Sequence, residues 1–280
     1  MSGTLFVVAT PIGNLEDITL RALRVMREAD LIAAEDTRRT SKLLAHYSIA
    51  TPTISFHEHS SRSRIPQLVA RLEAGGTIAL VTDAGTPGIA DPGIALVQAC
   101  WQRSIRIDPV PGACASLTAA VASGFSLEPL TILGFAPARS TDRDRWLERL
   151  QDIESTLVFF ETPHRIERTL ASIPKYFGDR PICVGREMTK VHQEFVAGDS
   201  ASVIGHITNI KGEFTVVIGP PVKRKSLETS PSEKELFDEF CHMTHKRPDR
   251  RASAAVLAKK YGLTTNFVYA AIERCRKTDE

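Results

Sequence analysis

Short apolar runs alternate with stretches of helical periodicity along most of this chain, and this alternation constrains its fold more than any other feature. In the first half, the runs predicted to be strands are residues 5–9, 31–34, 53–56, 78–81 and 105–109. Leu20, Leu23 and Met26 follow the first run at helical spacing, and we expect Asp17 to cap that helix. Strands that alternate with helices pair mostly in parallel, so the pattern predicts an α/β domain with a largely parallel sheet.

The alternation is interrupted once and then ends, which predicts three parts. Residues 123–129 break it, so we expect an N-terminal α/β domain over residues 1–126 and a second α/β domain over residues 127–222. The elements expected in the second domain are strands at 130–135, 156–160, 181–185, 194–196 and 214–218 and helices at 144–150 and 166–173. Residues 223–280 are expected to form a polar linker and a small helical unit, with helices at 233–242, 252–261 and 266–276.

The distribution of cysteine and apolar residues narrows the class of protein. The five cysteines are widely spaced and include no Cys-x-x-Cys pair, which argues against a disulfide framework and a structural zinc site. No apolar run approaches the roughly 18 residues that a membrane-spanning helix needs. No basic segment precedes the first apolar run, as it would in a signal peptide. The sequence therefore predicts a cytoplasmic protein that does not associate with membranes.

Loops rich in glycine and proline come directly after three predicted strands, at residues 10–14, 83–93 and 111–115. Open α/β sheets bind ligands beyond the carboxyl ends of their strands. Within the second loop, Asp83 and Thr86 supply an acceptor and a hydroxyl that suit an ammonium group or a ribose. Neither a Walker phosphate loop nor a Gly-x-Gly-x-x-Gly fingerprint is present, which argues against an ATPase and a dehydrogenase.

Charged clusters follow further predicted strands, at residues 35–40, 57–64, 161–165 and 186–190. Any one of them is compatible with a solvated loop, but their repetition at strand ends predicts a polar, arginine-rich cleft suited to phosphates. His57 and His59 have no third ligand at a recognisable spacing, so no metal is predicted. Residues 223–280 hold 13 Lys and Arg against 9 Asp and Glu, a mildly basic balance that is compatible with a polyanionic partner.

These segments together resemble a known enzyme family. The chain is similar to the ribosomal RNA small subunit methyltransferase I family, within the tetrapyrrole-methylase-like superfamily of enzymes that use S-adenosylmethionine. The resemblance extends over residues 4–220. The matching segments are residues 8–15, 33–38, 56–59, 83–93, 161–166, 186–190 and 211–213. Cys114, Thr162 and Met188 depart from the usual small hydroxyl residue, Ser and Leu at their positions.

The resemblance implies a fold, a reaction and a cofactor site. It implies two α/β domains with S-adenosyl-L-methionine in the cleft between them, usually in a homodimer. The implied reaction is methyl transfer to the ribose 2′-hydroxyl of a cytidine in small-subunit (16S) ribosomal RNA, either naked or in the assembled small subunit. The implied cofactor contacts are Pro11, Gly13, Asp83, Gly85, Thr86, Ile89, Ala113, Cys114, Ala115, Phe160, Lys211 and Gly212.

A ribose hydroxyl is a poor nucleophile at neutral pH, so a base or hydrogen-bond acceptor should assist it. Lys190 is the first candidate, provided that Arg38, Arg165 and Arg186 lower its pKa by like-charge repulsion, and Glu161 is the second. The other candidates are Glu35, Asp36, His164 and Glu187. The residues expected to contact RNA are Arg38, Arg39, His57, Arg62, Arg64, Arg165 and Arg186.

Three other functions stay open at this point. The first is a methyltransferase of the same superfamily that acts on a small, tetrapyrrole-like molecule. The second is an RNA-binding module without catalysis, in which the loop at residues 83–93 would have no ligand. The third is a dinucleotide oxidoreductase, which the missing glycine fingerprint argues against.

Overall fold

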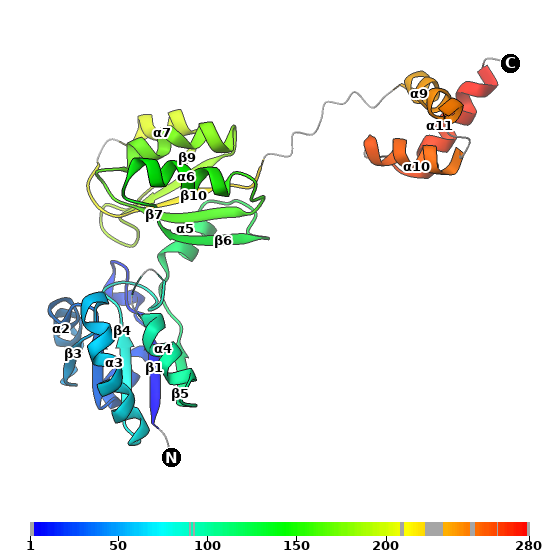
Figure 1. Ribbon diagram of the computed structural model, residues 1–280. Coiled ribbons are helices and arrows are strands. Elements are labelled where there is room, and N and C mark those ends of the chain that lie inside the picture. The colour runs from blue at the N-terminus through cyan, green and yellow to red at the C-terminus, as the bar shows by residue number, and fades with distance from the viewer. Residues whose placement is uncertain are drawn as a thin grey trace. The chain divides into compact units, whose positions relative to one another are not determined.

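The computed structural model describes residues 3–89, 91, 93–207, 210–221, 232–246, 250–261 and 263–278. The chain forms two compact units, Met1–Pro221 and Val222–Glu280. The first unit contains two five-stranded sheets with their helices, and the second contains three helices (Figure 1). The α/β class and the helical C-terminal unit predicted from the sequence are both confirmed.

The first sheet is wholly parallel, as predicted, with the strand order β3-β2-β4-β1-β5. Val8 lies opposite both Val81 and Val110, so β1, β4 and β5 end at the same level. The loops that follow these three strands therefore leave the sheet at one edge. The strands are β1 (Thr4–Val8), β2 (Leu31–Ala34), β3 (Thr53–Ser55), β4 (Thr77–Val81) and β5 (Arg106–Val110).

Helices cover both faces of the first sheet, which is why its central strands are almost entirely apolar. Met26 and Leu43 bring α1 and α2 into the core on one face, and Leu72 and Leu96 bring α3 and α4 into the core on the other. Asp17 does not cap α1, because residues 15–17 form a short 3-10 helix and Thr19 accepts the hydrogen bond from the N–H of Ala22 instead. The helices are α1 (Leu20–Glu28), α2 (Thr37–His46), α3 (Glu58–Glu73) and α4 (Gly93–Trp101).

The second sheet is mixed, with the strand order β6-β7-β10-β8-β9. β6 is parallel to β7, but β10 runs antiparallel to both β7 and β8, and β9 runs antiparallel to β8. The segment between β8 and β9 is too short for the crossover that a parallel pair requires. The strands are β6 (Leu130–Phe135), β7 (Thr156–Glu161), β8 (Ile182–Arg186), β9 (Glu194–Gly198) and β10 (Phe214–Ile218).

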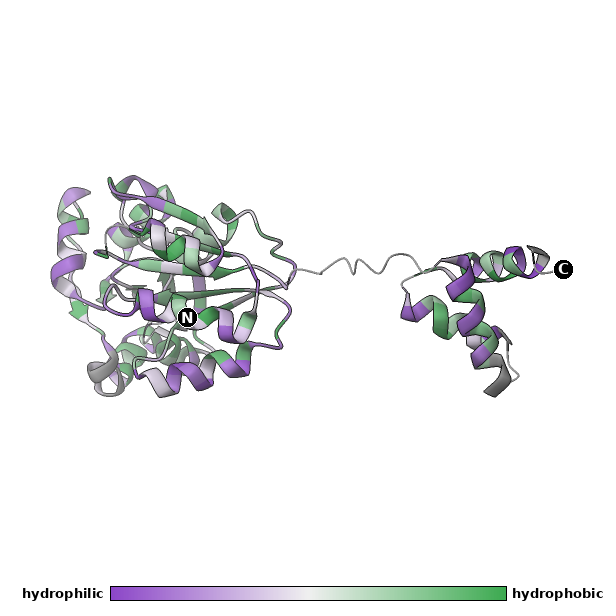
Figure 2. Ribbon diagram, turned by 90° about the horizontal axis from the view of Figure 1, so that it is seen from above, coloured by the Kyte–Doolittle hydropathy of each residue, from purple (hydrophilic) through white to green (hydrophobic). Residues whose placement is uncertain are grey.

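Helices α6 (Ser140–Leu150), α7 (Ile166–Phe177) and α8 (Ser200–His206) cover one face of the second sheet, and α5 (Ala115–Ala122) covers the other. α8 was not predicted from the sequence. Ala119 and Ala120 of α5 pack against Val158 and Val217. Because α5 directly follows β5 of the first sheet, it connects the two halves of this unit. The helices show alternating polar and apolar stripes, as expected for helices with one buried face (Figure 2).

The C-terminal unit consists of α9 (Glu233–Lys246), α10 (Arg250–Lys260) and α11 (Thr265–Thr278). Phe240, Leu257 and Val268 bring one residue from each helix into a shared core. An ion pair between Arg274 and Glu233 joins α11 to α9 at 2.7 Å. Among the residues that the structure describes, no helix is long and apolar enough to cross a membrane.

Candidate active site

A cavity of about 390 Å³, called the main cavity below, lies in the first unit between loops of its two sheets. Ile12 and residues 82–86 line it from the first sheet. Phe160, Met188 and residues 212–215 line it from the second sheet. Its volume falls within the roughly 300–1,000 Å³ typical of small-molecule sites. The cavity is therefore large enough for a nucleoside-sized ligand.

Most residues that the resemblance assigned to the cofactor line this cavity. The remaining four do not line it. Pro11 lines a smaller adjoining cavity, Gly13 packs against Lys190, the carbonyl of Ala113 accepts the Thr86 hydroxyl, and the carbonyl of Lys211 accepts Arg186. The residues that do line the main cavity are Asp83, Gly85, Thr86, Ile89, Cys114, Ala115, Phe160 and Gly212.

Hydrogen bonds join the loop after β1 to the loop after β4. Thr10 and Gly85 exchange two backbone hydrogen bonds, at 2.9 and 3.0 Å. Gly85 has a φ of +87°, a conformation that favours glycine. The carboxylate of Asp91 accepts the N–H groups of Gly88 and Gly93, both at 2.8 Å. Burial nevertheless raises the pKa of Asp91.

Phe135 lines the cavity beside Phe160 and was not predicted from the sequence to belong to the site. The centroids of the two rings lie 5.3 Å apart. Phe135 follows a shift in register between β6 and β7, and Gly134 before it has a φ of +71°. A glycine inside a predicted strand is the signal for such an irregularity. Exposed aromatic faces of this kind suit a planar ring in the ligand.

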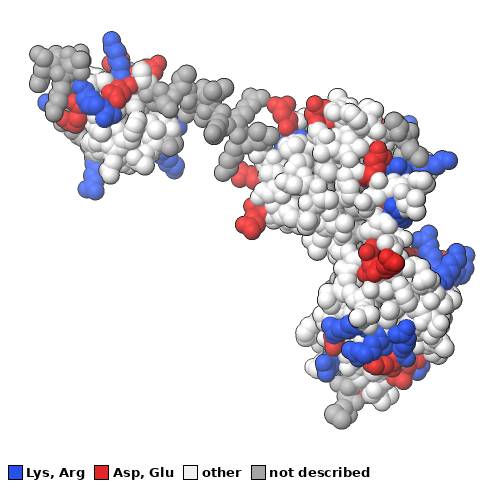
Figure 3. Space-filling model, turned by 180° about the vertical axis from the view of Figure 1, so that it is seen from behind, with Lys and Arg blue, Asp and Glu red and all other residues white. Residues whose placement is uncertain are grey.

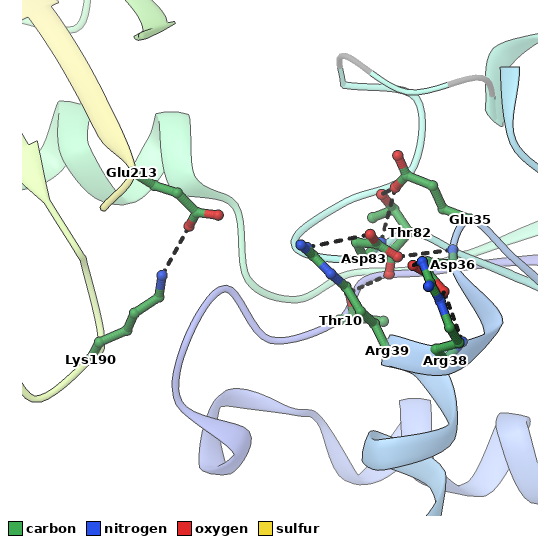
Figure 4. A network of polar contacts seen from close by, with 9 residues as sticks. All are labelled: Thr10, Glu35, Asp36, Arg38, Arg39, Thr82, Asp83, Lys190 and Glu213. Carbon is green, nitrogen blue, oxygen red and sulfur yellow. Dashed lines mark hydrogen bonds and ion pairs between the residues drawn. The ribbon is translucent and has the colours of Figure 1, made fainter. Parts of the chain in front are cut away.

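Two acidic side chains, Glu35 and Asp83, line the main cavity from the first sheet; we call them the acidic group (Figure 4). Glu35 accepts the hydroxyl of Thr82 at 2.6 Å and the N–H of Asp83 at 3.0 Å, both through Oε2. Among the residues described, no protein group donates to Oε1 of Glu35. Asp83 accepts the N–H of Asp36 at 3.0 Å and pairs with Arg39 at 3.4 Å. Burial, followed by the nearby charge of Glu35, raises the pKa of Asp83.

Glu161 has a different environment from the one expected of a base. Its side chain is fully buried. Oε1 accepts the N–H of Thr162 at 2.7 Å and pairs with Arg165 at 2.6 Å, while Oε2 accepts the hydroxyl of Thr169 at 2.7 Å. Both oxygens are therefore occupied within the protein. Glu161 holds Arg165 and the start of the next loop in place and has no oxygen available for a substrate proton.

Lys190 also differs from the expectation. Its Nζ donates to Glu187 at 2.8 Å and to Glu213 at 3.1 Å. Partial burial disfavours the charged ammonium, but these two hydrogen bonds outweigh it and raise the pKa of Lys190 above its usual value. The arginines were expected to lower it, so this part of the prediction is wrong. Glu187 belongs to the same motif as Lys190, but Glu213 could not be identified as a partner from the sequence because it lies on a distant segment.

Glycine allows the turn that carries Lys190 to fit beside the cavity. Glu187 and Thr189 have φ values of +46° and +66°, which are unusual for residues with side chains. A Cβ on Gly212 would lie 2.5 Å from Cγ of Glu187. The segments 186–190 and 211–213 therefore pack tightly against each other. Met188, in the first of them, lies in the cavity wall.

The residues predicted to contact RNA differ in how exposed their side chains are. Arg38 and Arg39 are exposed on α2, and His57 accepts the N–H of Ser60 as the N-cap of α3. Arg64 donates to Gln67 on the same helix, and the side chain of Arg62 lies outside the described residues. Lys and Arg gather in groups bordered by acidic side chains on the face drawn in Figure 3.

The expectation that Arg165 and Arg186 contact RNA is not supported. Arg165 pairs with Glu161, and Arg186 pairs with Glu194 at 3.0 Å while donating to the carbonyl of Lys211. Only 20% and 11% of their side-chain surfaces are exposed. Their guanidinium groups hold loops of the second sheet and are poorly placed to reach a phosphate.

The chain is similar to a known protein family and to named relatives within it. A profile described as Tetrapyrrole (Corrin/Porphyrin) Methylases matches residues 4–204. A protein of Synechocystis sp. named ribosomal RNA small subunit methyltransferase I is 42% identical over 272 residues, covering 95% of this chain and 96% of the relative. A protein of the same name from Thermotoga maritima is 47% identical over 218 residues, covering 77% of this chain and 98% of the relative.

A solved structure has the same fold at low sequence identity. Uroporphyrin-III C-methyl transferase from Thermus thermophilus, complexed with S-adenyl homocysteine, has a TM-score of 0.55 and 17% identity. The match covers 79% of this chain and 99% of that protein. The predicted two-domain α/β fold is therefore shared with solved methyltransferases.

Proposed function

Since this chain belongs to the tetrapyrrole (corrin/porphyrin) methylase family, we propose the following reaction for its main cavity. The protein is an S-adenosylmethionine-dependent methyltransferase that acts on small-subunit ribosomal RNA. The group methylated is the 2′-hydroxyl of a cytidine ribose. The observation that carries this proposal is the 42% identity to a ribosomal RNA methyltransferase along 96% of that relative's length. The aligned region covers 95% of this chain and so is not limited to the residues that line the cavity.

The residues of the main cavity fit S-adenosylmethionine. The carboxylate of Asp83 and the hydroxyl of Thr86 suit its ammonium and ribose groups, and the rings of Phe135 and Phe160 suit a purine. Gly85 and Gly212 allow the backbone to approach a ligand closely. When bound, this cofactor supplies an electrophilic methyl group on a sulfonium.

We assign the acceptor for the ribose proton to Glu35 instead of Lys190 or Glu161. Oε2 of Glu35 is held by Thr82 and Asp83, which fixes the carboxylate and leaves Oε1 for a substrate. Figure 4 shows Oε1 pointing away from those two partners. Oε1 would accept a hydrogen bond from the ribose hydroxyl, hold its oxygen in place, and take up its proton as that oxygen gains the methyl group that the sulfonium gives up. Such assistance typically contributes about 10²–10⁴-fold to a rate.

The nucleic-acid substrate is bound in this proposal by exposed basic side chains near the main cavity. Arg38 and Arg39 are best placed, because they lie in the first turn of α2, shortly after Glu35, and Arg39 lines the main cavity. The C-terminal helical unit adds further basic residues. We also propose a homodimer in the cytoplasm, as the family resemblance implies. Sedimentation equilibrium of the pure protein tests the homodimer directly.

Labelling of ribosomal RNA tests the proposed reaction. The protein is incubated with radiolabelled S-adenosylmethionine and small ribosomal subunits from cells that lack this enzyme. The expected product carries label in RNA and resists alkaline cleavage after one cytidine, because a methylated 2′-hydroxyl cannot attack the adjacent phosphate. Label on a base, with cleavage unchanged, would contradict ribose methylation. Cofactor binding without any label in RNA would favour a small-molecule substrate.

A further inference from the structure

A second cavity, of about 160 Å³, adjoins the main cavity on the side of α2. We call it the small cavity. Arg39, Thr82 and Asp83 line both cavities. The ion pair between Arg39 and Asp83 therefore lies in the wall between them. Any group held in the small cavity would sit next to the acidic group that includes Glu35.

The small cavity has a mixed lining. Pro11, Leu15 and Leu43 give it apolar surface, while Arg39 and Lys42 supply positive charge. Arg39 and Lys42 are three residues apart on α2, so they lie on the same face of that helix. The carboxylate of Asp83 in this lining is already paired with Arg39. Apolar walls with cations on one side suit a flat or ring-shaped group that carries a phosphate.

The volume restricts what can enter. Water occupies about 30 Å³ per molecule in the liquid, so the small cavity has room for about five waters. It is too small for S-adenosylmethionine, whose site is the main cavity, and large enough for the ribose or the pyrimidine ring of one nucleotide.

We propose that the small cavity receives the target nucleotide of a single-stranded RNA segment, an inference that rests on the proposed function. Lys42 and Arg39 bind its flanking phosphates, and its ribose lies at the shared wall within reach of Glu35. The nucleotide is displaced from its neighbours to enter, in the way that enzymes acting on a base take their target out of the stack.

Arg39 is suited to a change of partner when RNA binds. Its ion pair with Asp83 is long, at 3.4 Å, and 66% of its side-chain surface is exposed. Solvent screens the pair on the side of Arg39, which limits what the pair contributes to stability. If Arg39 paired with an RNA phosphate in place of Asp83, its side chain would move out of the shared wall. The small cavity would then open toward the main cavity.

Leu15→Trp tests the inference because the larger side chain would fill the small cavity. Leu15 is 38% exposed, so the indole can be accommodated without repacking a core. Leu20→Trp is the matched control, because Leu20 is 87% exposed and lines neither cavity. We expect Leu15→Trp to lower kcat/KM for small ribosomal subunits by about tenfold or more. Cofactor affinity measured by calorimetry should stay unchanged, and Leu20→Trp should leave both values unchanged.

Lys42→Ala gives a second measurement that does not depend on how the indole packs. Loss of one phosphate contact should reduce the slope of log affinity for single-stranded RNA against log salt by about 0.7. Lys175→Ala is its control, since Lys175 lies on α7 and bonds to the hydroxyl of Tyr176, away from both cavities.

The outcomes separate this inference from the proposed function. If wild-type protein does not label RNA, the proposed function fails first. If wild-type protein and Leu15→Trp label RNA equally well, only the small-cavity inference is overturned. Loss of cofactor affinity in Leu15→Trp, with KM for RNA unchanged, would assign the small cavity to the cofactor and also overturn it. An unchanged salt slope in Lys42→Ala would contradict the phosphate contact.

Discussion

Gly13 and Lys190 lie in direct contact, although they follow strands of two different sheets. A Cβ on Gly13 would lie 2.5 Å from Cγ of Lys190 and 2.9 Å from the carbonyl oxygen of Met188. The N–H of Asn14 donates to the hydroxyl of Thr189 at 3.0 Å in the same contact. The loop after β1 thus fixes the distance between the two walls of the main cavity.

Gly13→Ala should push these walls apart. Because a backbone oxygen lies within the clash, we expect a loss of about 1–3 kcal/mol in the free energy of unfolding, together with weaker cofactor binding. Chemical denaturation and calorimetry measure the two effects. Gly205→Ala, on α8 with nothing within 4 Å of its added methyl group, is the control and should be neutral or stabilising. Equal stability and equal cofactor affinity of the two variants would show that the contact between Gly13 and Lys190 does not set the spacing of the cavity walls.

Lys190→Arg separates a positioning role from a basic role. Arginine stays protonated, so it can pair with Glu187 and Glu213 but cannot accept a proton. Since those carboxylates raise the pKa of Lys190, we expect Lys190→Arg to keep most of the turnover and Lys190→Ala to lose it. The pH–rate profile of the wild type should show no limb that belongs to a lysine. Equal loss in both variants would restore Lys190 as the base.

Glu35→Gln should lower turnover by about 10²–10⁴-fold, because glutamine can orient a hydroxyl but cannot take its proton at neutral pH. Cofactor affinity should change little, and single-turnover methylation with saturating cofactor isolates the effect. Glu28→Gln on α1, which is mostly exposed and pairs only with Arg24 among the described residues, is the matched control. Full activity of Glu35→Gln would remove Glu35 from the mechanism.

Asp83→Asn should stabilise the fold while weakening cofactor binding. The pKa of Asp83 is raised by burial and by Glu35, so the folded protein holds that proton more tightly than the unfolded chain. This contribution to stability is therefore present at low pH and is lost as pH rises above 3.8, the usual value of the group. At pH 7 we expect a gain on the order of 1 kcal/mol that shrinks below pH 4. Thermal unfolding at both pH values measures it, and a gain that does not depend on pH would contradict the explanation.

A chain that ends at Pro221 should still bind the cofactor. Every residue that lines either cavity precedes residue 216, and residues 1–221 form a compact unit. The match to the relative from Thermotoga maritima covers 98% of that protein but only 77% of this chain. We expect unchanged cofactor affinity in calorimetry and a smaller salt dependence of RNA binding in filter assays. Loss of cofactor binding would mean that the helical unit supports the cavity.

The sequence was sufficient to predict the parallel strands of the first sheet and much of the lining of the main cavity. Parallel strands end at one edge, so glycine- and proline-rich loops that follow them must gather there. Asp83, Gly85, Thr86 and Cys114 accordingly line one cavity. Phe135 was missed because it lies within a strand whose local irregularity displaces it toward the site.

Charge pairing was decided only by the tertiary structure. Glu161, Lys190 and Arg186 occur in motifs that suggest catalysis or phosphate binding, but each is engaged by a partner within the protein. Three of the partners, Arg165, Glu187 and Glu194, are near in sequence, while Glu213 comes from a distant segment just before β10. The position of β10 between β7 and β8, which brings Glu213 to Lys190, could not be predicted from the sequence either. Periodicity records which face of an element is buried, whereas strand order and ion pairs depend on contacts between segments far apart in the chain.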